Sequence, residues 1–172
     1  IVVIHDPTLS PGGRFPRRFH VGHCVRTNVV GIEGRILQDK AELDVFLLHQ
    51  DGHVTTCRYG PDKEVRKTEC QEPAPYTDNR VGREDKNPWI FPDTEFVMLQ
   101  ATRLPDASIY MLDAANTSLY QFSYQLNLEH VMRPQYNRNY PLPDTKPSGF
   151  GISPDLELFL AFDNQLFIAP LR

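Results

Sequence analysis

Histidine and cysteine side chains that could hold a metal ion gather at two places in the chain. His20, His23 and Cys24 lie within five residues, and His49 and His53 are four residues apart. A structural zinc site takes four ligands, usually as two spaced pairs. The first group has no second pair at ligand spacing, and a predicted hairpin turn separates the two histidines of the second group. We therefore predict no metal site and no cofactor.

Three aspartates recur at equivalent places and could form a paired-carboxylate site. Asp51, Asp113 and Asp163 each lie between two apolar runs. Glycoside hydrolysis needs two carboxyl groups across one pocket. A turn also favours Asp, because its side chain accepts hydrogen bonds from the local backbone. We interpret the aspartates as turn residues and expect no catalytic residue and no small-molecule substrate; a glycosidase or sugar-binding protein is the alternative.

A basic segment interleaved with aromatic residues covers residues 14–26. Residues 14–35 contain five arginines against one acidic residue, in a chain of net charge −4 and pI near 5.8. Such a segment can bind an acidic protein surface, or phosphate groups, since nucleic-acid affinity is largely electrostatic. Arg14, Arg17 and Arg18 are therefore predicted to contact a protein partner, with weak nucleic-acid contact as the alternative.

A second predicted partner-binding segment contains the single tryptophan. Trp89, Ile90 and Phe91 lie between Pro88 and Pro92. Prolines reduce the entropy lost when a loop is ordered on binding, and tryptophan is enriched at interaction hot spots. The segment is predicted to bind a protein partner; alternatively, Trp89 packs back onto its own domain.

Three segments share one pattern, in which two apolar runs flank a tight Asp/Asn/Gly turn. They span residues 44–57, 108–122 and 156–169. This pattern predicts β-hairpins. The first run of each hairpin is almost continuously apolar, which indicates a strand buried on both faces between stacked sheets. A further apolar stretch precedes each hairpin, and no amphipathic stripe predicts a helix.

The spacing of the hairpins predicts one long insertion, and proline content predicts a second long loop. Phe46, Tyr110 and Phe159 occupy equivalent positions 64 and 49 residues apart. A propeller blade takes roughly 40 to 50 residues, so the first interval holds extra chain. Proline-rich stretches at about 60–93 and 133–148 are predicted to be loops between strands.

The segment from Gly149 to Ala161 resembles the opening of a blade in the WD-repeat and NHL-type propeller superfamily. Ser153-Pro154-Asp155 lies there between two apolar runs. The resemblance implies an all-β fold of consecutive antiparallel blades, with residues 1–172 as a single partial β-propeller domain. The ring would be incomplete, because about four to eight blades close one. A β-sandwich or barrel is the alternative.

Composition narrows the class of protein. No apolar run approaches the roughly eighteen residues of a membrane span. Three cysteines, an odd number, favour a reducing intracellular compartment, nuclear or cytoplasmic. Ile1 begins what reads as a strand already under way, so we expect a piece of a longer polypeptide. The propeller resemblance implies a non-catalytic scaffold that binds other protein subunits in a multiprotein complex.

Overall fold

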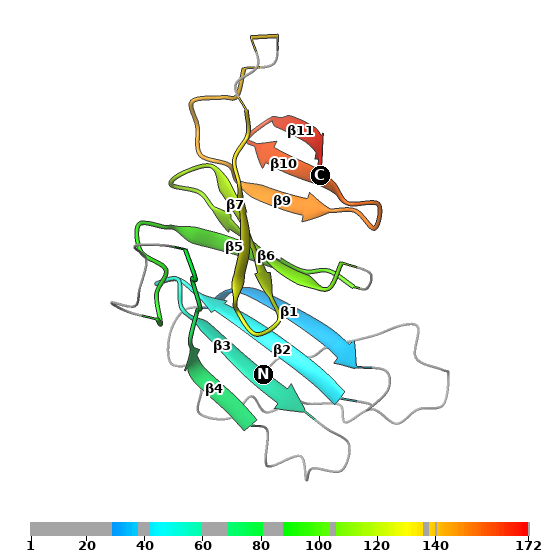
Figure 1. Ribbon diagram of the computed structural model, residues 1–172. Coiled ribbons are helices and arrows are strands. Elements are labelled where there is room, and N and C mark those ends of the chain that lie inside the picture. Colours follow the sequence, from blue (N-terminus) through cyan, green and yellow to red (C-terminus); the bar gives the residue numbers. More distant parts are fainter. Residues whose placement is uncertain are drawn as a thin grey trace.

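The computed structural model describes residues 29–37, 42–59, 69–80, 88–103, 106–135, 138–139 and 141–171. These residues form eleven β-strands and no helix, so no described helix could cross a membrane. The strands build three antiparallel sheets, stacked one above another in Figure 1. The first sheet contains β1 (Val29–Leu37), β2 (Glu42–His49), β3 (Val54–Tyr59) and β4 (Glu69–Ala74).

The second and third sheets follow in chain order. The second contains β5 (Phe96–Ala101), β6 (Ser108–Asp113), β7 (Ser118–Ser123) and β8 (Leu128–Met132). The third contains β9 (Gly149–Ile152), β10 (Glu157–Phe162) and β11 (Gln165–Pro170). Each sheet is an up-and-down meander in which strands consecutive along the chain pair with each other. The prediction of an all-β fold with three hairpins is confirmed: they are β2–β3, β6–β7 and β10–β11.

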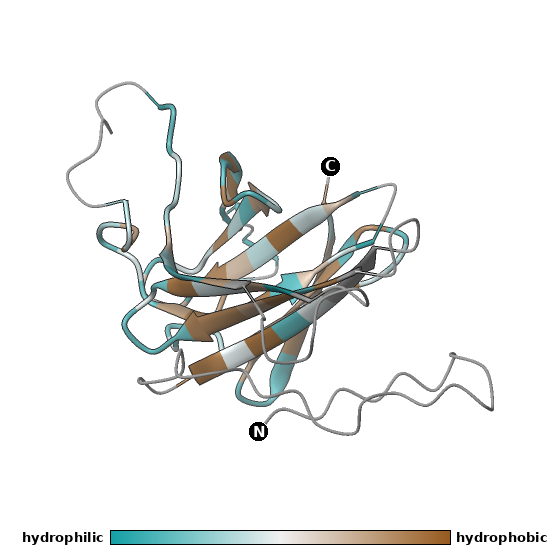
Figure 2. Cartoon of the chain, turned by 90° about the horizontal axis from the view of Figure 1, so that it is seen from below, coloured by the Kyte–Doolittle hydropathy of each residue, from teal (hydrophilic) through white to brown (hydrophobic). Residues whose placement is uncertain are grey.

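The second sheet is covered on both faces by the other two. All six residues of β6 are buried. Because successive side chains of a strand point to opposite faces, Ile109 and Met111 pack with the first sheet, whereas Tyr110 and Leu112 pack with the third. Figure 2 shows hydrophobic residues concentrated along the strands. The burial of this strand on both faces confirms what its continuous apolar run predicted.

The first strands of the three sheets are neighbours. β1 lies against β5, and β5 lies against β9. At Gly31 of β1 an added Cβ would be 3.5 Å from the backbone nitrogen of Leu99 on β5, which is ordinary van der Waals distance. The sheets therefore spread outward from a shared edge, but the described residues do not form a closed ring.

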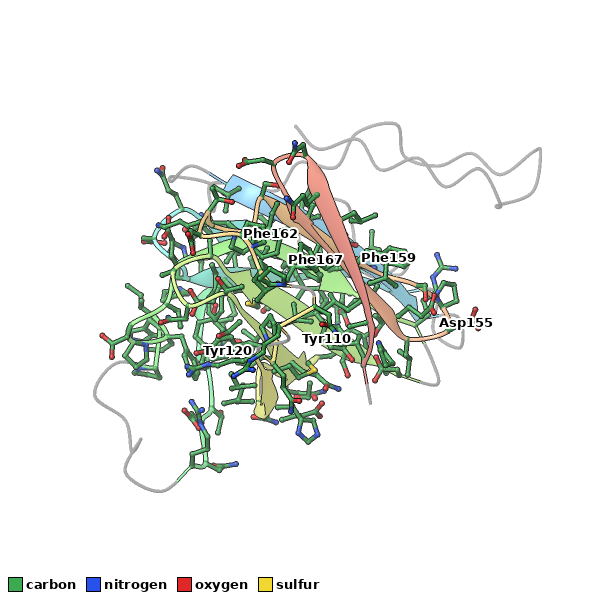
Figure 3. The ribbon with its side chains drawn as sticks, turned by 90° about the horizontal axis from the view of Figure 1, so that it is seen from above. Tyr110, Tyr120, Asp155, Phe159, Phe162 and Phe167 are labelled. Carbon is green, nitrogen blue, oxygen red and sulfur yellow. A yellow bond between two sulfur atoms is a disulfide. The ribbon has the colours of Figure 1, made fainter. Side chains whose placement is uncertain are left out.

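The outer face of the third sheet remains apolar and exposed. Leu160 and Phe162 of β10 point inward and are buried, and Phe167 of β11 packs edge-to-face on Phe162 (Figure 3). Leu166 and Ile168 of β11 point to the other face and are each 60% exposed. In contrast with the second sheet, the described residues cover the third on one face, so the predicted burial of β10 on both faces is wrong for this part of the chain.

The predicted loop at 60–93 is partly wrong. β4 lies inside it and pairs with β3. Its sequence hides the strand because it contains Pro73, which cannot donate a hydrogen bond to a neighbouring strand. Proline is tolerated here because β4 is the edge strand of its sheet and the register shifts at this point. The described residues of the second predicted loop, 133–148, contain no strand.

Candidate functional site

The aromatic segment predicted to bind a partner divides into an exposed and a buried part. Trp89 and Ile90 are 42% and 38% exposed. Phe91 is buried and packs edge-to-face against Tyr76 and Tyr120, with ring centroids 5.8 and 5.3 Å apart. Phe91 therefore anchors the turn to the core, and its buried side chain is not accessible to a partner. Partner binding by Trp89 and Ile90 stays a prediction.

The basic segment lies outside the described residues. This holds for Arg14, Arg17 and Arg18, and equally for the candidate ligands His20 and His23. Their roles stay predictions.

Two of the three cysteines form a disulfide, which the irregular spacing did not predict. Cys57 on β3 and Cys70 on β4 are direct partners in the antiparallel ladder, with Cα atoms 4.1 Å apart. Because β3 and β4 run antiparallel, these residues, thirteen apart in sequence, meet across the sheet. The odd number of cysteines did not predict this bond, and the cellular compartment stays a prediction.

The two turn-flanking histidines lie face to face. His49 ends β2, and His53 directly precedes β3, with Gly52 at a φ of 89° in the turn between them. The backbone N–H of His49 donates to the His53 carbonyl at 2.9 Å. The backbone N–H of Gly52 donates to the His49 carbonyl, also at 2.9 Å. The imidazole rings stack with centroids 3.9 Å apart. The turn that seemed to separate the two residues makes them a cross-strand pair.

A carboxylate from the neighbouring strand joins this pair. On β4, Glu72 and Pro73 together oppose the single residue Thr55 of β3, which is a β-bulge. Bulges re-aim side chains. Ligand atoms of His49, His53 and Glu72 all lie within 4.8 Å of one another. We name these three residues the His–His–Glu cluster; sequence reasoning missed it, because the bulge cannot be seen in the sequence.

Hydrogen bonds hold the cluster in place. His49 Nε2 lies 2.8 Å from Thr55 Oγ1, and His53 Nδ1 lies 2.5 Å from Asp51 Oδ1. The Tyr76 hydroxyl donates to the Gly52 carbonyl at 2.8 Å, which ties the turn to the core. His53 Nε2 is buried and has no hydrogen-bond partner among the described residues.

The surroundings favour a neutral imidazole at His49 and an ionised carboxylate at Asp51. Burial lowers the pKa of His49, and the neighbouring His53 lowers it further. Burial tends to raise the pKa of Asp51, but hydrogen bonds from the backbone and ring of His53 outweigh it and lower that pKa. At neutral pH the His49 imidazole is therefore neutral, the form that binds metal ions, and the Asp51 carboxylate is ionised.

Asp51 and Asp113 show the local hydrogen bonding that the sequence predicts for turn aspartates. Asp113 Oδ1 accepts hydrogen bonds from the backbone N–H groups of Ala115 and Glu95 at 3.1 and 3.0 Å. Asp51 Oδ1 accepts from the His53 N–H at 3.2 Å, and Asp163 adopts a positive φ of 40° in its turn. Turn geometry accounts for each of them, as in the interpretation made from sequence.

A cleft of about 410 Å³ lies between the first sheet and the turn after β7. The Cys57–Cys70 disulfide and the Asp44–Arg58 ion pair line it, with the Arg58 Nε–H donating to Asp44 Oδ1 at 2.7 Å. The charged groups of this lining neutralise each other, and the His–His–Glu cluster lies outside it.

Neither a protein-family model, nor a curated protein, nor a solved structure matches this chain. The resemblance to propeller blades therefore stays a prediction from the sequence.

Proposed function

We propose that this chain is part of a β-propeller that acts as a non-catalytic, protein-binding scaffold in a larger intracellular assembly. The observation that carries the proposal is the outer face of the third sheet. There Leu166 and Ile168 are exposed, with Phe159 of β10 half-buried on the same face. Burying large apolar side chains contributes about 1.5–3 kcal/mol each, so a face of this kind favours a covering sheet.

The order of the strands supports propeller blades over a sandwich. Each sheet begins at the edge shared with its neighbours and runs outward as a meander, and the second sheet is packed on both faces. Propeller blades are arranged around an axis in this way. A two-sheet sandwich would leave no third sheet on the far side of β6.

A scaffold role fits the exposed turn residues. Trp89 and Ile90 present apolar surface next to the anchored Phe91, so their position is set before a partner binds. Preorganised aromatic residues lose little entropy on association. Other protein subunits are the partners proposed for this surface.

Site-specific labelling tests whether the outer face of the third sheet is covered in the full-length protein. Cysteines introduced as Leu166→Cys and Ile168→Cys should react rapidly with a maleimide in the isolated chain, read by peptide mass spectrometry. In the natural full-length protein they should be protected, while the turn control Asn164→Cys reacts in both. Equal reactivity of Ile168→Cys and Asn164→Cys in the full-length protein would overturn the blade proposal.

Partner capture tests the scaffold role separately. Trp89→Ala with Ile90→Ala should reduce copurification of specific subunits from cells at least several-fold, whereas the exposed control Glu129→Ala should not. Binding that falls steeply with salt and is competed by nucleic acid would favour the nucleic-acid alternative. Unchanged subunit recovery would remove this surface from the proposal.

A further inference from the structure

The His–His–Glu cluster has the composition of a metal site. Two imidazoles and a carboxylate are a common protein ligand set for zinc and similar ions, and they leave one coordination position for water or a further ligand. Here the three side chains come from three sequential strands or their turn, so one ion would tie β2, β3 and β4 together.

We propose that His49, His53 and Glu72 bind a divalent transition-metal ion of the zinc type, with Asp51 orienting His53. The ion would lie at the turn end of the β2–β3 hairpin, next to the Gly52 carbonyl that Tyr76 holds. This site goes beyond the scaffold role and does not depend on it.

The buried Nε2 of His53 is the independent observation that points to a ligand. The His53 side chain is 10% exposed, and its Nε2 has no hydrogen-bond partner among the described residues. A buried polar atom without a partner destabilises the fold, so such atoms are rare unless something else satisfies them. A metal ion on Nε2 would satisfy this atom.

The surrounding bonds match those of known metal-bound histidines. Such histidines usually donate their other ring N–H to a carboxylate or carbonyl, which sets the tautomer. His53 Nδ1 is hydrogen-bonded to Asp51 Oδ1, and this bond leaves the lone pair on Nε2. His49 is likewise held through Nε2 by the hydroxyl of Thr55.

Binding requires a small rearrangement. Atoms that bind one tetrahedral ion at about 2.0–2.2 Å lie about 3.3–3.6 Å from each other. The ligand atoms of His49, His53 and Glu72 are within 4.8 Å of one another, a limit wider than that spacing. Glu72 is exposed and can rotate inward. An ion also lies in the plane of each ring that binds it, so two rings stacked 3.9 Å apart cannot both bind until one turns. Metal binding is therefore expected to break the stack.

Calorimetric titration of the metal-free chain with Zn²⁺ tests the proposal. The protein is treated with a chelator and exchanged into buffer without reductant, which preserves the Cys57–Cys70 disulfide. We expect one ion per chain at this site and a rise in Tm with zinc. Glu72→Gln and His53→Asn should weaken binding at least ten-fold, and Asp51→Asn should weaken it about 10- to 100-fold.

Two controls separate this site from other zinc ligands of the chain. His130→Asn removes an exposed histidine of β8 and should leave the affinity unchanged. NMR signals of the His49 and His53 rings should shift on addition of zinc and should not shift in Glu72→Gln. Because Glu72 is exposed, that variant should keep the metal-free Tm of the wild type, which shows that it folds. Equal zinc affinity of wild type and Glu72→Gln, or ring signals that zinc leaves in place, would overturn the proposal.

Discussion

Gln100 on β5 makes two hydrogen bonds to the backbone of Ile152 on β9. Its Nε2 donates to the Ile152 carbonyl at 3.1 Å, and its Oε1 accepts from the Ile152 N–H at 2.9 Å. The side-chain amide thus occupies the place that a peptide group of a neighbouring strand would take. It connects the second and third sheets at the edge where their first strands meet.

Replacing this amide should destabilise the packing of the third sheet. Gln100→Leu keeps the side-chain volume but leaves the N–H and carbonyl of Ile152 without their partner. Leaving a buried polar group without a partner costs about 1–3 kcal/mol. We therefore expect the free energy of unfolding, measured in urea, to fall by an amount in that range. Gln125→Leu, at an exposed turn position, should change stability by less than about 0.5 kcal/mol. Equal unfolding midpoints for the two variants would contradict the bridging role.

Asp113 should be structural. It is fully buried and accepts hydrogen bonds from three backbone N–H groups and from the Asn116 side chain, the last at 2.7 Å. Asp113→Ala should lower the free energy of unfolding by about 1–3 kcal/mol, because these donors lose their acceptor. Asp155→Ala, at an exposed turn, serves as the control and should change it little. A wild-type unfolding curve for Asp113→Ala would refute this role.

The stability of the metal-free protein should fall in mild acid through His49. Its pKa in the folded state lies below the ordinary value of 6.5, because of burial and the nearby His53, against the opposing charges of Glu72 and Asp51. Above pH 6.5 both folded and unfolded states carry a neutral His49. As pH falls below 6.5, the unfolded state takes up the proton first, so stability decreases.

Urea unfolding at pH 7.5 and pH 5.5 measures this loss. The decrease should be smaller in His49→Asn, which removes the titrating group, and unchanged in His130→Asn. The same decrease in all three proteins would show that His49 is not its source.

The disulfide should stabilise the first sheet. A bond that closes a loop of this length contributes about 3 kcal/mol by restricting the unfolded chain. Reductant should therefore lower the urea midpoint of the wild type, and the double variant Cys57→Ser with Cys70→Ser should not respond to it. A midpoint insensitive to reductant in the wild type would contradict this expectation.

The same bond gives a test of the cellular compartment. Disulfides persist in oxidising compartments and are rare in the cytosol and nucleus. If the protein is nuclear or cytoplasmic, rapid thiol trapping in cells should find Cys57 and Cys70 reduced. Finding them oxidised would place the protein in an oxidising environment and remove the intracellular part of the proposal.

The sequence by itself determined the local features of this protein. The apolar runs around the turns at Asp51, Asp113 and Asp163 predict the hairpins, because neighbouring residues alone decide a tight turn. The continuous apolar run of β6 predicts burial on both faces, because every side chain along it favours removal from water. These features depend on residues close together in the chain.

Only the tertiary structure decided which distant residues meet. The pairing of β4 with β3 joins Cys57 to Cys70, and a one-residue bulge on β4 brings Glu72 to the two histidines. Phe91 likewise turns inward because Tyr76, Tyr120 and Phe122 offer it an aromatic pocket. The pairing and register of strands distant in sequence depend on the packing of whole sheets, so a pattern read along the chain does not contain them.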